Sequence, residues 1–214
     1  MFLYKEFIKN FEKAILKSRR NIEEVEIIAV SKRKSISDVL SIIKEGQLSF
    51  GENQLQEALQ KWPSIKNNNI KLHFIGGIQS KKLNDIIDYF DVIHSIDREK
   101  LLYIISKVNK SKIQNKEFFI QVNTGNETQK SGITLNKTES FIQLCKDSGI
   151  HISGLMCLPP ENEHPGKHFQ ILQSLAKNNH IKSLSMGMTN DYEIALRYGS
   201  THIRIGTAIF GKRD

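Results

Sequence analysis

Lys32 is the residue whose type and position point most directly to chemistry. It follows Ile27–Val30, a short apolar run with β-branched residues that is typical of a buried parallel strand. A lysine there places a primary amine at the carboxyl end of a strand, the edge at which α/β folds bind ligands. A desolvated amine can form a Schiff base with a carbonyl compound. A solvated loop lysine is the alternative, and this stretch alone leaves both open.

Two glycine-containing segments near the C-terminus could hold an anion. Leu184–Asp191 (LSMGMTND) leads from a predicted strand through Gly187 into a helix and carries two hydroxyl side chains. Arg204–Gly211 (RIGTAIFG) leads from the last predicted strand through Gly206 and Thr207. Small residues let backbone N–H groups approach a phosphate, although each glycine alone is also typical of a plain turn.

Arg204 alternates with Ile203 and Ile205, so its side chain faces away from two apolar neighbours. If that side is the interior of a barrel, the guanidinium needs a hydrogen-bond acceptor, because an unpaired buried charge is very costly. A carboxylate from another strand could supply it, and Glu52 and Asp97 are candidates. A heteroaromatic ring nitrogen of a ligand is the functional alternative.

Short strands and helices alternate along the whole chain. The strands are predicted at Ile27–Val30, Leu48–Gly51, Leu72–Ile75, Val92–Ser95, Glu117–Asn123, Ile150–Cys157, Ser183–Ser185 and Thr201–Ile205. Helices are predicted at Ser37–Glu45, Gln54–Lys61, Lys81–Phe90, Arg98–Asn109, Lys137–Ser148, about His168–Asn178 and Asp191–Tyr198.

This alternation predicts the α/β class and a closed (β/α)8 TIM barrel. An amphipathic helix with Phe7, Phe11, Ala14 and Ile15 on one face precedes the first strand, and we expect it to cover the gap left by a missing eighth helix. A doubly wound open sheet is the alternative, but no GxGxxG follows the first strand. Since no linker interrupts the pattern, residues 1–214 are expected to form a single domain.

The net charge of +8 raises the question of nucleic-acid binding. The lysines are spread over every segment and no nucleic-acid-binding motif occurs, so we expect no nucleic-acid partner. We expect no membrane association either, because no apolar run is long enough to span a bilayer. Cys145 and Cys157 form no CxxC pair and have no histidine at metal-ligand spacing, which favours a reducing cytoplasm and no metal site.

An amine, a phosphate cradle and an arginine donor match the three ends of pyridoxal 5′-phosphate. Seven segments resemble the pyridoxal phosphate homeostasis protein family, also called the proline synthetase co-transcribed family, which is related to the N-terminal barrel of alanine racemase. They are AVSK (Ala29–Lys32), FGENQLQEA (Phe50–Ala58), LHFIGGIQSKK (Leu72–Lys82), QVNTGNETQKSGI (Gln121–Ile133), GLMCLPP (Gly154–Pro160), LSMGMTNDYEIAL (Leu184–Leu196) and GSTHIRIGTAIFG (Gly199–Gly211).

The resemblance implies a fold type III barrel that binds pyridoxal phosphate through eight residues. Lys32 would carry the cofactor as an internal aldimine, Asn53 would lie beside it, Ser185, Met186, Gly187, Gly206 and Thr207 would surround the phosphate, and Arg204 would face the pyridine nitrogen. The sequence departs from the family at Gly76–Ile78, where a larger residue and a leucine are usual.

We expect a carrier or regulator of the cofactor and not an enzyme, so no residue is predicted to be catalytic. An arginine at the pyridine nitrogen disfavours its protonation, which makes the ring a poorer electron sink. The resemblance to alanine racemase implies a need for a second acid or base, a tyrosine from an extra domain, and no tyrosine here matches it. The alternative is an enzyme with low amino-acid racemase or decarboxylase activity.

The expected role is homeostasis of this form of vitamin B6, by storage, delivery or scavenging, with an effect on amino- and keto-acid metabolism. Apo forms of cofactor-dependent enzymes are possible partners, and the resemblance suggests a monomer or weak dimer. His73 and His202 are expected to be hydrogen-bonded structural residues. The polar loop Asn126–Gly132 is expected to be solvated, with a lid or a partner surface as the alternative.

Overall fold

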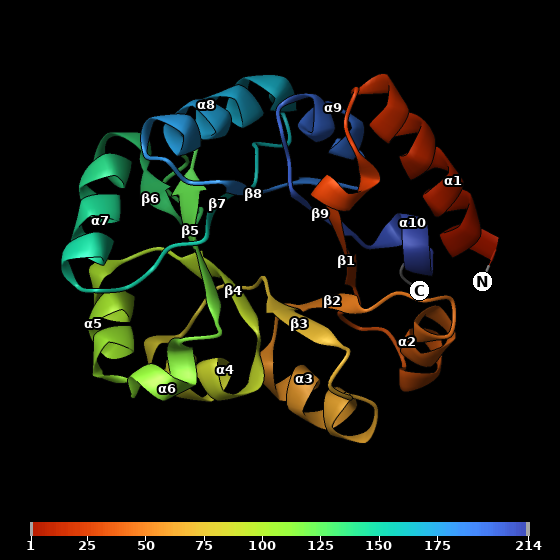
Figure 1. The fold of residues 1–214 in the computed structure, drawn as a ribbon, viewed down its shortest axis with the longest axis horizontal. Coiled ribbons are helices and arrows are strands. Elements are labelled where there is room, and N and C mark those ends of the chain that lie inside the picture. Colours follow the sequence, from red (N-terminus) through yellow and green to blue (C-terminus); the bar gives the residue numbers. More distant parts are fainter. Residues whose placement is uncertain (1, 213–214) are drawn as a thin grey trace.

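The computed structural model describes residues 2–212 and forms a closed ring of parallel strands surrounded by helices (Figure 1). The strand order is β4-β3-β2-β1-β9-β8-β7-β5-β6, and the pairing of β4 with β5 closes the ring. The strands are β1 (Glu26–Val30), β2 (Ser49–Glu52), β3 (Lys71–Phe74), β4 (Val92–Ile96), β5 (Glu117–Asn123), β6 (Ile133–Thr134), β7 (Gly154–Cys157), β8 (Ser183–Met188) and β9 (His202–Ile205).

The helices alternate with the strands and lie outside the ring. They are α1 (Phe2–Lys17), α2 (Ile36–Ile43), α3 (Leu55–Lys61), α4 (Leu83–Tyr89), α5 (Glu99–Lys107), α6 (Lys110–Ile113), α7 (Leu135–Asp147), α8 (Pro165–Asn178), α9 (Tyr192–Arg197) and α10 (Thr207–Phe210). Three short 3-10 turns lie at Ile22–Glu24, Trp62–Ser64 and Ser80–Lys82. The predicted (β/α)8 barrel is therefore confirmed.

Helix α1 covers the side of the barrel where β9 is followed only by the short α10. Its apolar face, which includes Phe7, Phe11, Ala14 and Ile15, is buried. The helix packs against α9 and α10, and the ring of Phe7 meets the ring of Tyr192 edge to face, with centroids 5.6 Å apart. The prediction that the first helix fills the place of a full eighth helix is confirmed.

The bounds of most predicted elements shift in the structure, and three of the shifts are informative. Strand β7 begins at Gly154 and not at residue 150, because the N–H of Ile150 donates to Cys145 at 2.9 Å and closes the end of α7, with Gly149 at φ 68°. The helix expected at 98–109 ends at Lys107, because Val108 is extended, and Asn109 caps a separate short helix, α6, that was not predicted. Strand β8 continues to Met188, three residues beyond its predicted end at residue 185.

The barrel interior differs from the usual layers of branched apolar side chains. Phe118 and Ile120 of β5 belong to the large core between strands and helices, so Phe119 faces inward, where it packs with Val92 and Met156. Much of the remaining interior is polar, and five buried side chains there are considered below: His73, His94, Ser185, His202 and Arg204.

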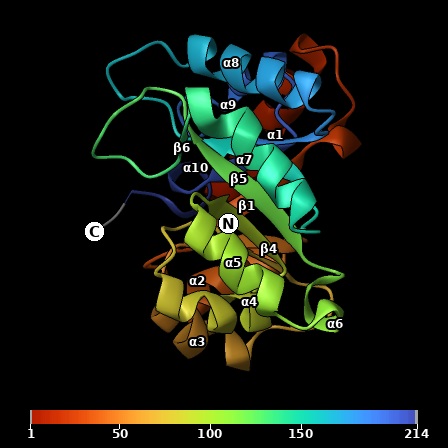
Figure 2. The ribbon, with the colours of Figure 1, turned by 90° about the vertical axis from the view of Figure 1, so that its left-hand side faces the viewer.

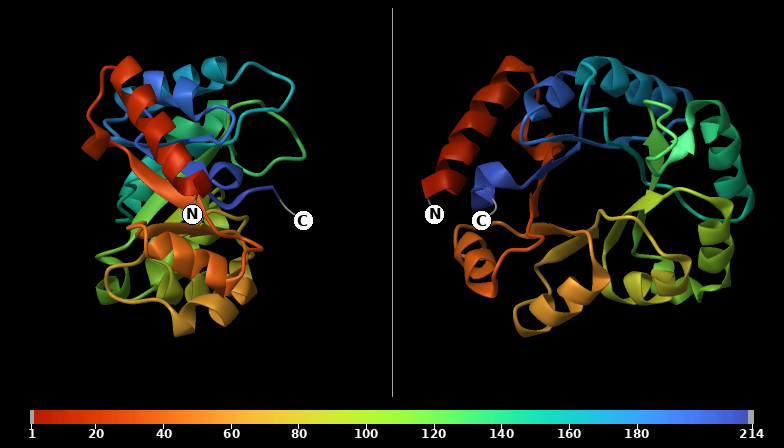
Figure 3. Two further views of the ribbon diagram at one scale, coloured as in Figure 1. Left: turned by 90° about the vertical axis from the view of Figure 1, so that its right-hand side faces the viewer. Right: turned by 180° about the vertical axis from the view of Figure 1, so that it is seen from behind.

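Two loops project together from the carboxyl end of the barrel, one after β5 and one after β7 (Figures 2 and 3). They touch, since the Lys130 ammonium lies 3.4 Å from the carbonyl oxygen of Pro159. The loop after β5 is thus held against the loop after β7. It also leads into the two-residue strand β6, which was not predicted. Within residues 2–212, no helix is both long and apolar enough to cross a membrane.

Candidate cofactor site

A cavity of about 1130 Å³ opens at the carboxyl ends of the strands. Its lining includes five of the eight residues predicted to bind a cofactor: Lys32, Asn53, Arg204, Gly206 and Thr207. These residues come from the ends of β1, β2 and β9, which are neighbours in the ring. The structure therefore brings together an amine, an amide, a guanidinium and a small-residue turn that are far apart in the sequence.

Lys32 is half-buried and extends from a strand end that is fixed on several sides. The preceding residue, Ser31, is fully buried, and its hydroxyl donates to the Glu52 carboxylate at 2.8 Å. The backbone N–H of Ser31 donates to the Gly51 carbonyl at 3.0 Å, and its carbonyl accepts from the Lys61 ammonium at 2.7 Å. Such bonds hold the backbone from which the Lys32 amine enters the cavity.

The Arg204 guanidinium is buried, with only 4% of the residue exposed. It donates to the Ser185 hydroxyl at 2.6 Å and to the Cys157 carbonyl at 2.9 Å. Burial lowers the pKa of Arg204. Because these bonds use two of its five N–H groups and the residue also lines the cavity, Arg204 can donate to a ligand.

The two candidate carboxylate partners of Arg204 are engaged elsewhere. Glu52 pairs with Lys61 at 2.9 Å, and Asp97 pairs with Arg98 at 2.5 Å. Arg204 is instead held by neutral oxygens, a hydroxyl and a carbonyl, so of the two alternatives left open by the sequence the ion pair with Glu52 or Asp97 is not the one found.

The other three predicted residues, on β8, lie outside the cavity lining. Ser185 and Met186 are fully buried, and the Ser185 hydroxyl is held between Arg204 and His94. Gly187 adopts φ 94°, and an added Cβ would lie 2.7 Å from the Cβ of Ala195. Because β8 runs on to Met188, the turn that reaches the cavity starts later than the sequence suggested.

The residues of β8 and its following turn that do line the cavity are Met188, Thr189, Asn190 and Asp191. The Asp191 carboxylate accepts the N–H of Met188 at 2.6 Å, which shapes this turn. Burial raises the pKa of Asp191. Of these residues, sequence reasoning noted only the hydroxyl of Thr189. The available sequence signal was the pair of apolar residues Met186 and Met188, whose spacing of two indicates that the strand continues beyond residue 185.

The end of β5 supplies two further polar lining residues that were not predicted, Gln121 and Asn123. The Gln121 amide donates to the Ser131 carbonyl at 3.0 Å, and the Asn123 amide donates to the Glu127 carbonyl at 2.8 Å. Lys130 pairs with Glu127 at 2.7 Å. The polar loop after β5 is thus folded back over the cavity, which fits the lid alternative better than a fully solvated loop.

Gly76 and Gly77, where the sequence departs from the family pattern, line the cavity at the end of β3. A Cβ at Gly76 would overlap the carbonyl oxygen of Asn53, whereas a Cβ at Gly77 would meet nothing within 4 Å. The Gly76 carbonyl accepts the hydroxyl of Ser95 at 2.5 Å. The loop therefore approaches Asn53 backbone to backbone, which only a glycine at position 76 permits.

His73 and His202 are buried and hydrogen-bonded, as expected for structural residues. His73 contacts Glu26 at 3.0 Å and His94 at 3.0 Å, and His202 contacts Glu26 at 3.2 Å. In the part of the chain that the structure describes, no group of three or more histidine, cysteine or acidic side chains could hold a metal ion.

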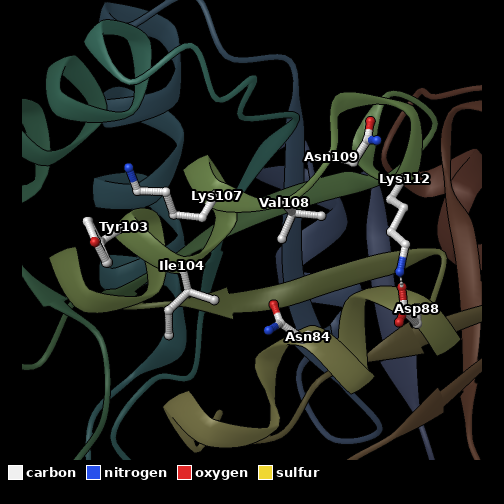
Figure 4. A pocket seen from close by; sticks show the side chains of 8 residues that line it. All are labelled: Asn84, Asp88, Tyr103, Ile104, Lys107, Val108, Asn109 and Lys112. Atoms are coloured by element: carbon white, nitrogen blue, oxygen red, sulfur yellow. Dashed lines mark hydrogen bonds and ion pairs between the residues drawn. The ribbon is translucent and has the colours of Figure 1, made fainter.

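A second hollow, of about 480 Å³, lies outside the barrel on helices α4, α5 and α6 (Figure 4). Its lining consists mainly of exposed side chains, such as Tyr103, Lys107 and Asn109. The one ion pair drawn in it, between Lys112 and Asp88 at 2.8 Å, is itself exposed. With no buried polar group directed into it, this hollow lacks the features of a binding site.

Fold and cavity together define a barrel protein of the alanine racemase N-terminal type, with a lysine at the end of the first strand. The family model "Alanine racemase, N-terminal domain" matches residues 8–214. Solved alanine racemases share the fold at low identity: the enzyme from Acinetobacter baumannii is 14% identical, with a TM-score of 0.73, over 95% of this chain and 60% of that chain.

Within that class, the chain belongs to the pyridoxal phosphate homeostasis protein family. It is 37% identical to the protein of that name from Vibrio alginolyticus over 92% of this chain and 91% of the relative. It is 35% identical to the Escherichia coli K12 protein over 91% and 88%. The structure of PipY from Synechococcus elongatus with PLP bound is 27% identical, with a TM-score of 0.77, over 92% of this chain and 97% of that chain.

Proposed function

We propose that this protein binds pyridoxal 5′-phosphate and maintains its supply, by storing, delivering or scavenging the cofactor. The observation that carries the proposal is the shared cavity of Lys32, Arg204, Gly206 and Thr207. The names of the relatives, pyridoxal phosphate homeostasis protein, and the PLP bound to PipY support the same ligand.

The residues present fit the three polar parts of this cofactor. When bound, pyridoxal phosphate supplies an aldehyde that a primary amine can attack reversibly. Lys32 supplies the amine, and the bonds around Ser31 keep it at the cavity. Arg204 donates toward the ring nitrogen, and Gly206 with Thr207 offers small residues and a hydroxyl to the phosphate. Asn53 orients the ring from the β2 side.

We further propose that Ser185, Met186 and Gly187 act from behind the cavity wall. Ser185 fixes Arg204 through the 2.6 Å bond, while Met186 fills the core and Gly187 lets the chain turn toward the cavity. Thr189 then takes the role of hydroxyl donor to the phosphate, because it lines the cavity and Ser185 is committed to Arg204.

We propose a carrier or regulator and not an enzyme, because the cavity offers little for amino-acid chemistry. Arg204 opposes protonation of the pyridine nitrogen of the cofactor, so the ring would withdraw electrons only weakly from a bound amino acid. Among the described lining residues there is no tyrosine or histidine to act as the second acid or base. The protein would act in the cytoplasm as a monomer or weak dimer, with apo forms of cofactor-dependent enzymes as recipients and no nucleic-acid partner.

The alternative is an enzyme with low racemase or decarboxylase activity. One observation favours it: Asp191 lines the cavity and burial raises the pKa of its carboxyl group, which makes it more available as an acid near neutral pH. Against this, the Asp191 carboxylate already accepts the N–H of Met188 at 2.6 Å.

The proposal is tested by adding pyridoxal phosphate to the purified protein and reducing the complex with borohydride. We expect one equivalent of cofactor to remain attached, at Lys32, as measured by intact and peptide mass spectrometry. Lys32→Ala is expected to lose this label. Lys34→Ala removes a second cavity lysine, bonded to the Phe210 carbonyl at 3.2 Å, and is expected to keep it. Undiminished labelling of Lys32→Ala would refute the assignment.

A further inference from the structure

A file of four hydrogen bonds runs through the barrel interior from Arg204 to Glu26. Arg204 contacts the Ser185 hydroxyl at 2.6 Å, which contacts Nδ1 of His94 at 2.9 Å. Nε2 of His94 contacts Nδ1 of His73 at 3.0 Å, and Nε2 of His73 contacts the Glu26 carboxylate at 3.0 Å. The five residues come from five different strands, β9, β8, β4, β3 and β1.

The middle of this file is sealed from solvent. Ser185, His94 and His73 have no exposed surface, and Arg204 has 4%. The Glu26 end is more open, because its side chain keeps 25% of its surface. A polar chain of this kind in a barrel interior replaces apolar layers and is tolerated only when every member is bonded.

The two ends of the file fix the direction of every hydrogen bond in it when both histidine rings are neutral. Arg204 can only donate and an ionised Glu26 can only accept. His73 therefore donates from Nε2 to Glu26 and, as a neutral ring, accepts at Nδ1 from Nε2 of His94. A neutral His94 then has no hydrogen on Nδ1, so the Ser185 hydroxyl donates to that nitrogen while it accepts from Arg204. Both histidines are then Nε2–H tautomers.

The Glu26 end is strongly biased toward the ionised form. Burial alone would raise the pKa of Glu26, but hydrogen bonds from His202 and His73 hold that pKa well below its ordinary value. Ser49 also donates to this carboxylate at 2.5 Å, and Lys71 pairs with it at 3.3 Å.

The histidines are surrounded so that neither gains a proton easily. Burial lowers the pKa of both His73 and His94, and the groups facing them include Lys71, His202 and Arg204. Glu26 acts in the opposite direction on both, and Lys71 is itself shared with Glu117 at 2.7 Å. The ring of Phe119 stacks on His94 with centroids 4.5 Å apart, which fixes the plane of that ring.

We propose that Ser185, His94 and His73 are positioning residues that lock the Arg204 guanidinium toward the cavity and anchor it to Glu26 at the far end of the barrel. A directional chain with one arrangement of hydrogens leaves Arg204 one orientation of its Nη1 group. The part of this inference that concerns the ring of the bound cofactor rests on the proposed function. The file itself belongs to the protein without any ligand.

The first test needs no cofactor and uses the unmodified full chain. In ¹⁵N spectra of histidine-labelled protein, His94 and His73 are expected to show a bare Nδ1 and a protonated Nε2, unchanged from pH 8 down to pH 5. Slow rotation about the Arg204 Nε–Cζ bond is expected to give separate Nη signals. An Nδ1–H tautomer for either histidine, an ordinary titration near pH 6.5, or a freely rotating guanidinium would overturn the proposal.

The second test compares variants that remove a hydrogen bond of the file with variants that replace the same residue but keep a group able to form that bond. His94→Leu and Ser185→Ala remove the support, so the separate Arg204 signals are expected to merge and the Kd for pyridoxal phosphate to rise at least tenfold. Ser185→Thr keeps a hydroxyl and His94→Asn keeps an acceptor for it, and both are expected to restore most of the affinity and the separate signals. Thr138→Val removes a buried hydroxyl that donates to the Thr134 carbonyl at 3.0 Å, outside the file, and serves as the control.

The outcomes separate this inference from the proposed function. If the unmodified protein binds no pyridoxal phosphate, the proposed function fails. The histidine tautomers and the Arg204 signals still test whether the hydrogen-bond file holds Arg204 in place. If the protein binds the cofactor and His94→Leu, folded as judged by its urea midpoint, keeps both the affinity and the separate Arg204 signals, the positioning role is overturned. Equal losses in Ser185→Thr and Ser185→Ala would also overturn it.

Discussion

The Lys61 ammonium lies 2.7 Å from the carbonyl oxygen of Ser31, the residue that precedes Lys32. The same ammonium pairs with Glu52 at 2.9 Å and with Glu57 at 2.8 Å, and only 6% of the Lys61 side chain is exposed. Glu52 is fully buried and also accepts from the Ser31 hydroxyl at 2.8 Å. The cavity lysine is therefore carried by a strand end that a second, buried lysine holds in place.

Replacing Lys61 with methionine is expected to destabilise the protein by about 3–5 kcal/mol, because the buried Glu52 carboxylate would lose its balancing charge. The free energy of unfolding, from urea titrations of Lys61→Met and the parent, measures the effect. The double variant Lys61→Met/Glu52→Gln removes both charges and is expected to recover at least about 1 kcal/mol. A double variant as unstable as the sum of the two single variants would contradict a direct pairing.

Gly76→Ala tests the close approach of the Gly76–Gly77 loop to Asn53. The new methyl group would overlap the Asn53 carbonyl oxygen, so the loop or β2 must shift. We expect a loss of about 1–3 kcal/mol in stability and a roughly tenfold rise in the Kd for pyridoxal phosphate. Gly77→Ala is the matched control, because its methyl group would meet nothing within 4 Å and should leave both quantities nearly unchanged. Similar losses in the two variants would argue against the contact.

Cys157 is expected to make the protein less stable as the pH rises above 9. Burial raises the pKa of its thiol to about 12, from 9.0, so the unfolded chain releases this proton first. Between those two values the unfolded state binds fewer protons than the native state, and stability falls by about 1.4 kcal/mol per pH unit for this group. Below pH 8 the thiol is protonated in both states and has no effect.

Urea titrations at pH 8 and pH 10 measure this dependence. The loss on raising the pH is expected to be about 1.4 kcal/mol smaller in Cys157→Ala than in the parent, even though the substitution lowers stability at both pH values. Taking the difference between the two proteins cancels the contribution of tyrosines and lysines that titrate in the same range. An equal loss in both proteins would show that Cys157 is not the source.

The sequence alone was enough to predict the barrel, because the hydrophobic periodicity of the segments, their lengths and their order along the chain all indicate alternating strands and helices. Short β-branched runs such as 27–30 alternate with helical segments, and Phe7 and Phe11 mark the face of the covering helix. Lys32, Arg204 and the Gly206-Thr207 turn could be placed at the cavity for the same reason: each lies at or just beyond the end of a strand. Residues at strand ends can be placed from periodicity once the fold is known.

The rest of the site depends on where strands end and on long-range pairs, which local patterns do not encode. Gly187 obscured the continuation of β8, so Ser185 was assigned to the phosphate although the structure buries it against Arg204. The partners of Arg204 could not be predicted because Cys157 lies 47 residues away and supplies a backbone carbonyl, which any residue type has. His94 carried no sequence signal, since its role depends on pairing with two other strands.

The protein loaded with pyridoxal phosphate is expected to convert amino acids no faster than the free cofactor does. A working second acid or base contributes roughly 10²–10⁴-fold in rate, and the described lining has neither tyrosine nor histidine. Chiral chromatography of a panel of amino acids after incubation with the loaded protein, with free cofactor and with Lys32→Ala measures the difference. Asp191→Asn is included because Asp191 is a half-buried acid of the cavity, and burial raises the pKa of its carboxyl group. A Lys32-dependent rate at least about 100-fold above the free cofactor, lost in Asp191→Asn, would establish the enzyme alternative instead.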